Sequence, residues 1–222
     1  MLFPENLENF GIILKGSSIV RLGEISNNFD HCFIVNNIDK NKNNRDSEYS
    51  LVAPLIKNKS IVHFVNRLKT ASLQRQHYSE LGIKNIQFTK SELDKELIKV
   101  KRIYEKYKLK CHMLPEELLS YNKYFDGKGD YEKKHPNTGV LSIIYATKII
   151  KPRNLWIVGL DFYESDYLFR RPWHWDLKNQ REKMERLDIP GQFIKLVDDN
   201  FQVQFNVISK ASLPELKNLN VL

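Results

Sequence analysis

One histidine late in the chain is a candidate general base. His174 lies in the segment Pro-Trp-His-Trp-Asp at positions 172–176, and it is the last histidine in the sequence. An imidazole titrates near neutral pH, so it can accept the proton that an attacking hydroxyl group loses. A histidine between two tryptophans also suits a packed structural position. The residues alone leave both interpretations open.

Small, amide-bearing or basic residues follow three apolar runs in the first third of the chain. Residues 11–14 lead into Lys15, Gly16, Ser17 and Ser18, residues 31–35 into Asn36, and residues 60–65 into Asn66. Short apolar runs that stop at turn residues predict buried strands. The carboxyl ends of parallel strands face one crevice, so we expect these polar groups to converge on a ligand site. Ordinary turn formation, which Asn and Ser favour, is the alternative.

The familiar motifs that bind nucleotides or metals do not occur in this sequence. It has no Walker-type glycine-lysine loop, no Gly-x-Gly-x-x-Gly after the first apolar run, no Asp-x-Asp, and no Cys/His spacing typical of zinc. A transferase with this sequence would therefore stabilise its leaving group without metal. A CMP-sugar suits that constraint, because backbone N–H groups, tyrosine hydroxyls and imidazole can meet the charge of departing CMP.

The remaining apolar and charged patterns predict further elements of an α/β chain. Strands are expected at residues 86–88, 155–160 and 202–207, and helices at about 89–108, 114–124, 140–150 and 176–187. A helix followed by a strand is typical of a parallel sheet with helices on its faces. We therefore predict one Rossmann-like, mostly parallel sheet flanked by helices, in a single domain over residues 1–222. Residues 126–130 and 164–190 are candidates for a flexible lid, and the latter for an acceptor-side segment.

The composition favours a globular protein. Hydrophobic residues make up 41% of the sequence, and the net charge is +8. This charge suits an anionic partner such as a nucleotide-sugar, an anionic membrane surface or nucleic acid, but the positive residues are spread along the chain and are better explained as parts of solvated loops and helix faces. Cys32 lies in an apolar run and Cys111 is the only other cysteine, so we expect no disulfide. Without a signal peptide or spanning segment in the sequence, we expect a cytoplasmic protein, with peripheral contact to the inner face of a membrane as an option.

Several segments resemble the bacterial sialyltransferases. Residues 12–19 are similar to their opening strand and phosphate-side turn, and residues 29–36 and 62–66 are similar to two strands that end in donor-binding asparagines. The strongest resemblance runs from residue 135 to residue 163, which looks like the small sialylmotif and the segment after it. The chain departs from the family at Lys15, which replaces an asparagine, and at Ser17, which replaces a proline.

The resemblance implies a GT-A-like sialyltransferase fold and a set of site residues. By family position, Tyr163 and Tyr167 would hydrogen-bond the donor phosphate and His174 would be the base. The nucleotide and donor sugar would be bound by Lys15, Gly16, Ser17, Ser18, Asn36, Asn66, Asn137, Thr138 and Gly139. Without the resemblance, the two tyrosines are better explained as packing residues. His174 also resembles a histidine in a separate aromatic motif of the animal-type relatives. If it belongs to that motif, the general base is unassigned.

The leading hypothesis is a metal-independent, inverting transferase with no cofactor. It would move a sialic acid, or a related keto-acid sugar such as Kdo, from a CMP-sugar donor to a hydroxyl of a glycan or glycolipid acceptor. One alternative is a non-catalytic basic α/β module that binds nucleic acid or an anionic membrane surface. Nucleic acid is the less favoured partner, because the basic residues are dispersed and no base-stacking motif occurs. Another alternative is a degenerate transferase that binds its donor without turnover.

Overall fold

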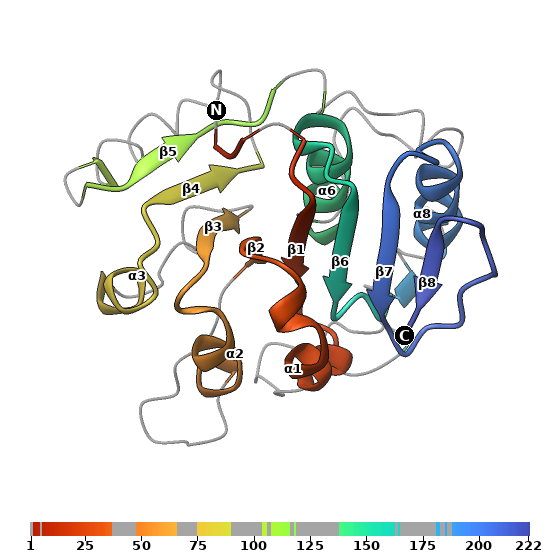
Figure 1. Ribbon diagram of the computed structural model, residues 1–222, viewed down its shortest axis with the longest axis horizontal. Helices are drawn as coiled ribbons and strands as arrows, with labels where there is room; N and C mark the ends of the chain where they lie inside the picture. The colour runs from red at the N-terminus through yellow and green to blue at the C-terminus, as the bar shows by residue number, and fades with distance from the viewer. Residues whose placement is uncertain are drawn as a thin grey trace.

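The chain folds around one open sheet of parallel strands. The computed structural model describes residues 2–4, 6–36, 48–65, 75–89, 104–105, 108–115, 118, 138–162, 164, 181–182, 185 and 188–222. Within these ranges, eight strands form a sheet in the order β5-β4-β3-β2-β1-β6-β7-β8 (Figure 1). Every neighbouring pair of strands is parallel. The predicted α/β, Rossmann-like fold class is confirmed, and the sheet is parallel throughout rather than mostly.

The strands have the following bounds: β1 Asn9–Ile13, β2 His31–Val35, β3 Ser60–Val65, β4 Asn85–Phe88, β5 Lys110–His112, β6 Asn154–Val158, β7 Gln204–Ile208 and β8 Leu219–Val221. The predicted strands at 31–35 and 60–65 match β2 and β3 residue for residue. Those at 11–14, 86–88, 155–160 and 202–207 match β1, β4, β6 and β7 to within two residues at each end. These runs were recognisable because a strand buried on both faces is apolar along its whole length.

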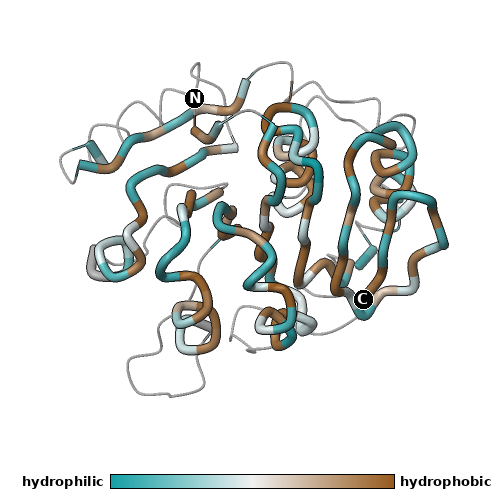
Figure 2. Tube along the Cα trace, viewed as in Figure 1, coloured by the Kyte–Doolittle hydropathy of each residue, from teal (hydrophilic) through white to brown (hydrophobic). Residues whose placement is uncertain are grey.

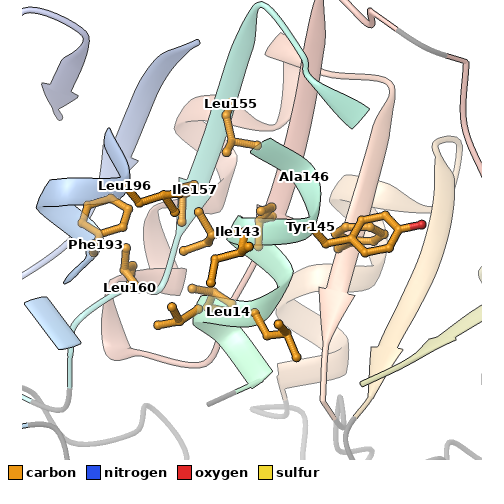
Figure 3. Packing of buried hydrophobic residues seen from close by; sticks show 14 of the residues in the cluster. Leu14, Ile143, Tyr145, Ala146, Leu155, Ile157, Leu160, Phe193 and Leu196 are labelled. Carbon is orange, nitrogen blue, oxygen red and sulfur yellow. The ribbon is translucent and has the colours of Figure 1, made fainter. Parts of the chain in front are cut away.

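Two hydrophobic cores cover the two faces of the sheet. On one face lie α6 (Thr138–Tyr145), its π-helical continuation η5 (Ala146–Ile150) and α8 (Ile189–Asp198). Figure 3 shows side chains of α6 and of α8 packed against Leu155 and Ile157 of β6. The opposite face packs against η1 (Ser17–Arg21), α1 (Leu22–Ile25), α2 (Glu48–Ile56) and α3 (Arg75–Glu80), and η2 (Ser26–Asn28) follows α1. The result is the layered arrangement expected when a parallel sheet is buried on both sides.

Several elements, among them α1, α2, α3, α8, β5 and β8, did not follow from the sequence patterns. The second and third residues of α8 are Pro190 and Gly191, a pair that signals a turn, yet proline is well accepted in the first turn of a helix. Its buried residues Ile189, Phe193, Leu196 and Val197 recur at helical spacing, and the helix carries both hydrophobic and hydrophilic residues (Figure 2). β5 and β8 are the two edge strands, each three residues long, and so short a run has no recognisable periodicity.

Other predictions fall mainly outside the described residues. These are the helices at 89–108, 114–124 and 176–187, the connection at 126–130, and most of the segment at 164–190. The predicted helix at 140–150 is present, and it begins two residues earlier, at Thr138. Both cysteines are described and neither forms a disulfide, as expected.

Candidate functional site

The carboxyl ends of β1 and β6 lie side by side where the strand order reverses (Figure 1). β1 pairs with β2 on one side and with β6 on the other. In open α/β sheets such a switch point creates a crevice outside the carboxyl ends of the strands, where ligands bind. The segments that follow β1, β2 and β6 are therefore the candidates for ligand contact.

Two glycines allow the segments after β1 and β6 to touch. The N–H of Gly16 donates to the carbonyl of Gly159 at 2.9 Å. A Cβ at Gly16 would lie 2.5 Å from Oδ2 of Asp161, and a Cβ at Gly159 would lie 2.8 Å from the carbonyl group of Leu14. Gly159 also has a φ of +82°, which favours glycine. Neither position has room for a side chain, so the turn after β1 is fixed against the end of β6.

The carboxylate of Asp161 joins the ends of three strands. It is 2% exposed and follows β6. Oδ1 accepts the hydroxyl of Ser18 at 2.5 Å and the N–H of Lys210, after β7, at 3.0 Å. Oδ2 accepts the N–H of Ser18 at 2.9 Å and lies 3.4 Å from the hydroxyl of Ser17, both after β1. A buried carboxylate with several donors is well satisfied, and it holds the turn after β1 in a single conformation.

The predicted site residues in this turn differ in their surroundings. Lys15, Gly16 and Ser17 are partly exposed, whereas Ser18 is 1% exposed. The oxygen of the Ser18 hydroxyl also accepts the N–H of Gly159 at 3.1 Å. The side chain of Ser18 is thus engaged with the protein, and its part in the site is to shape the turn. Asp161 was not predicted as a site residue, although a Gly-x-Asp sequence directly after an apolar strand is a signal that could have found it.

Asn36 lies beside this turn, at the end of β2. The register pairs Ile13 of β1 with Ile34 of β2, and Lys15 and Asn36 each follow two residues later. Asn36 has a φ of +60°, and its N–H donates to the carbonyl of Phe64 on β3 at 2.9 Å. Asparagine tolerates this left-handed conformation better than most residues. Its side-chain oxygen is buried and has no hydrogen-bond partner within the described part of the chain.

The start of α6 supplies a third part of the site. Thr138, which is buried, and Gly139 are its first two residues, and the helix contacts β2 and β3. In Figure 3, Ile143 of α6 lies close to Leu14, which directly follows β1, and to Leu160, two residues past the end of β6. The first N–H groups of a helix lack partners within the helix, and they favour anions such as phosphate. The start of α6 is therefore a candidate for binding a phosphate at this edge of the sheet.

The remaining predicted site residues lie outside the described residues. They are Asn66, Asn137, Tyr163, Tyr167 and His174. The described part of the predicted site is the turn at 15–18, Asn36, and the helix start at residues 138 and 139. These are seven of the nine predicted nucleotide- and donor-binding residues, and they follow β1, follow β2 and begin α6. That they bind a nucleotide together stays a prediction.

Two further observations apply to the described ranges alone. No group of three or more His, Cys, Asp or Glu side chains there is arranged to hold a metal ion. No helix in those ranges combines the length and the apolar character needed to cross a bilayer. Metal independence stays a prediction, which a chelator can test directly.

The fold is similar to that of a solved sialyltransferase. The crystal structure of a variant of the sialyltransferase CST-II in complex with CMP matches with a TM-score of 0.55 at 18% sequence identity, covering 96% of this chain and 89% of that chain. At this level of identity the likeness establishes the shared fold. No family model matches the sequence, and no curated protein matches it.

Proposed function

We propose that this protein is a glycosyltransferase that moves a sialic acid, or a related keto-acid sugar such as Kdo, from its CMP ester to a hydroxyl of a glycan or glycolipid. The observation that carries the proposal is the position of the turn at residues 15–18 and of Asn36 after the neighbouring strands β1 and β2, at the switch point of a sheet that α6 covers. The match to a CMP-bound sialyltransferase over nearly the whole chain supports it.

The donor would be held by backbone groups and amides at the carboxyl edge. The N-terminal N–H groups of α6, at Thr138 and Gly139, suit the phosphate of CMP, and Lys15 supplies a nearby positive charge. Asn36 offers an acceptor that has no partner among the described residues. Asn66 and Asn137 are proposed to complete the nucleotide site, as the sequence resemblance implies.

In the proposed reaction, the acceptor oxygen attacks the anomeric carbon from the face opposite the phosphate. Its proton passes to the imidazole of His174, the new glycosidic bond forms, and the bond from the anomeric carbon to the phosphate oxygen breaks. CMP leaves with the bonding electron pair, and hydrogen bonds from Tyr163 and Tyr167 stabilise its charge. The configuration is inverted, and the transition state resembles an oxocarbenium ion.

The test is release of CMP from CMP-Neu5Ac and from CMP-Kdo, with a mixture of glycan acceptors, in the presence and absence of EDTA. We expect release that resists the chelator, and we expect His174→Ala to slow it by about 100-fold or more. His31→Gln is the matched control, because His31 lies at the amino end of β2, on the opposite edge of the sheet. It should retain the wild-type rate.

Four outcomes would contradict this mechanism in different ways. A requirement for a divalent ion would refute metal independence, and an unaffected His174→Ala variant would refute the assigned base. Binding of CMP without any release from either donor would favour a degenerate transferase. Absence of CMP binding, together with polynucleotide affinity that falls steeply with salt, would favour the basic binding module instead.

A further inference from the structure

Asn36 is held in an unusual backbone conformation by contacts with a single neighbouring strand. Its φ of +60° lies in the left-handed region, and both of its backbone hydrogen-bonding groups are engaged by β3. The N–H donates to the carbonyl of Phe64 at 2.9 Å, and the carbonyl lies 2.8 Å from Nε2 of His63. The direction of the amide of Asn36 at the carboxyl edge therefore depends on β3.

His63 is a fully buried imidazole with a partner on each nitrogen. It lies on β3 with 0% exposure, and its Nδ1 is 2.9 Å from the hydroxyl of Tyr78 on α3. The carbonyl of Asn36 can only accept, so Nε2 must carry a proton and donate it. A neutral ring then leaves Nδ1 as an acceptor for the Tyr78 hydroxyl. The chain of hydrogen bonds thus runs in one direction, from Tyr78 through His63 to Asn36.

Burial supports this neutral, one-directional arrangement. It lowers the pKa of His63 to about 4, with a smaller contribution in the same direction from the positive charge of Lys15. The hydrogen bond to the Asn36 carbonyl opposes that shift only in part. Burial also raises the pKa of the Tyr78 hydroxyl, so this group keeps the proton that it donates. Both protonation states are therefore constant near neutral pH.

We propose that His63, fixed by Tyr78, is a positioning residue that sets the conformation of Asn36 for binding the nucleotide of the donor. The proposal rests on the proposed function, because it needs Asn36 to contact that nucleotide. If these hydrogen bonds only satisfied buried polar groups of the core, they could end on any backbone carbonyl group. This one ends on the left-handed residue whose side-chain oxygen is buried without a partner in the described ranges. His63 acts through Asn36 and does not itself touch the ligand.

The test is a thermodynamic cycle on CMP affinity, measured by calorimetry. His63→Leu removes the donor to Asn36 and should weaken CMP binding by about tenfold, the effect of one lost hydrogen bond to a fixed backbone. Asn36→Gly removes the amide and keeps a residue suited to positive φ. In the Asn36→Gly background, His63→Leu should change CMP affinity by less than about twofold, because interacting residues are not additive.

Two further variants separate positioning from stability. His63→Gln places an amide donor within reach of the Asn36 carbonyl and should restore CMP affinity to within about threefold of wild type. Ile61→Ala, in the same strand and buried at 4% exposure, should lower the melting temperature without weakening CMP binding. In turnover assays the His63→Leu variant should show a raised KM for the donor and a kcat within about twofold of wild type.

The outcomes distinguish failure of this proposal from failure of the proposed function. If the wild type neither binds CMP nor consumes a CMP-sugar, the function is wrong and the role of His63 falls with it. If the wild type binds CMP and folded His63→Leu binds equally well, the positioning role alone is overturned. It is also overturned if His63→Leu weakens CMP binding by the same factor with and without the Asn36→Gly substitution. If His63→Leu does not fold, a tenfold loss in folded His63→Gln would be the contradicting result.

Discussion

The hydroxyl oxygen of Ser18 lies 2.5 Å from Oδ1 of Asp161, although 143 positions separate the two residues in sequence. The same carboxylate accepts the backbone N–H groups of Ser18 and Lys210. One buried side chain therefore fixes the ends of β1, β6 and β7 relative to one another. A carboxylate in this position is stabilised by its hydrogen-bond donors. Replacing it with a group that cannot accept all of these hydrogen bonds should therefore lower the free energy of unfolding.

Asp161→Asn should destabilise the protein and weaken CMP binding together. The amide NH₂ that replaces one oxygen would face donors from Ser18 or Lys210, leaving at least one buried group unpaired. We expect a loss of about 2–3 kcal/mol in the free energy of unfolding, measured by urea denaturation. Asp198→Asn, on the exposed end of α8, is the control and should change stability by less than about 0.5 kcal/mol. Equal stability of the two variants would refute the role assigned to Asp161.

Gly16→Ala should distort the turn after β1. Its Cβ would lie 2.5 Å from Oδ2 of Asp161 and 2.6 Å from the carbonyl oxygen of Gly159, and the carbonyl belongs to the backbone, which cannot move aside easily. We expect a melting temperature several degrees lower, corresponding to about 1–3 kcal/mol, and weaker binding of CMP.

Gly23→Ala provides a matched comparison for that substitution. Gly23 lies in α1, and a Cβ there would have nothing within 4 Å. Because alanine lowers the entropy of the unfolded chain and favours helix, this variant should be as stable as wild type or more stable by about 0.4–1 kcal/mol. A Gly16→Ala variant that behaves like Gly23→Ala would show that the turn has more room than the close contacts indicate.

Stability should decrease in acid because His63 is buried as a neutral ring. Its pKa is lowered from 6.5 to about 4, chiefly by burial. Between these two pH values the unfolded chain binds a proton that the folded chain does not, so the free energy of unfolding falls as the pH falls. The contribution is on the order of 3 kcal/mol between about pH 6.5 and pH 4. Urea denaturation at several pH values should show a flatter dependence for His63→Gln, and parallel curves would contradict this assignment.

The two cysteines should differ in reactivity in the native protein. Burial raises the pKa of Cys32 to about 12, whereas Cys111 is partly exposed. Since the thiolate is the reactive form, iodoacetamide at about pH 8 should modify Cys111 more than about tenfold faster than Cys32, as followed by mass spectrometry of the peptides. In denaturing urea the two rates should become similar. Comparable rates without urea would mean that Cys32 becomes accessible through opening of the core.

Much of the sheet could be predicted because strands buried on both faces are continuously apolar. The runs at 31–35 and 60–65 coincide with β2 and β3, and Asn36, directly after β2, lies at the carboxyl edge. The sequence did not predict α8, because the pair Pro190 and Gly191 is typical of a turn. It did not predict β5 and β8, because a strand of three residues is too short to show a hydrophobic periodicity. The positions of Tyr163, Tyr167 and His174 were predictions from resemblance, and they stay predictions.

The sequence by itself determined the fold class, most strand positions and the polar residues that end the strands, since these depend on local hydrophobic periodicity. Only the tertiary structure decided that Asp161 joins three strand ends and that His63 donates to Asn36. It also decided that Ser18 faces the protein interior. These relationships connect residues far apart in sequence, and their geometry is fixed by strand order and register, which no local pattern of residues encodes.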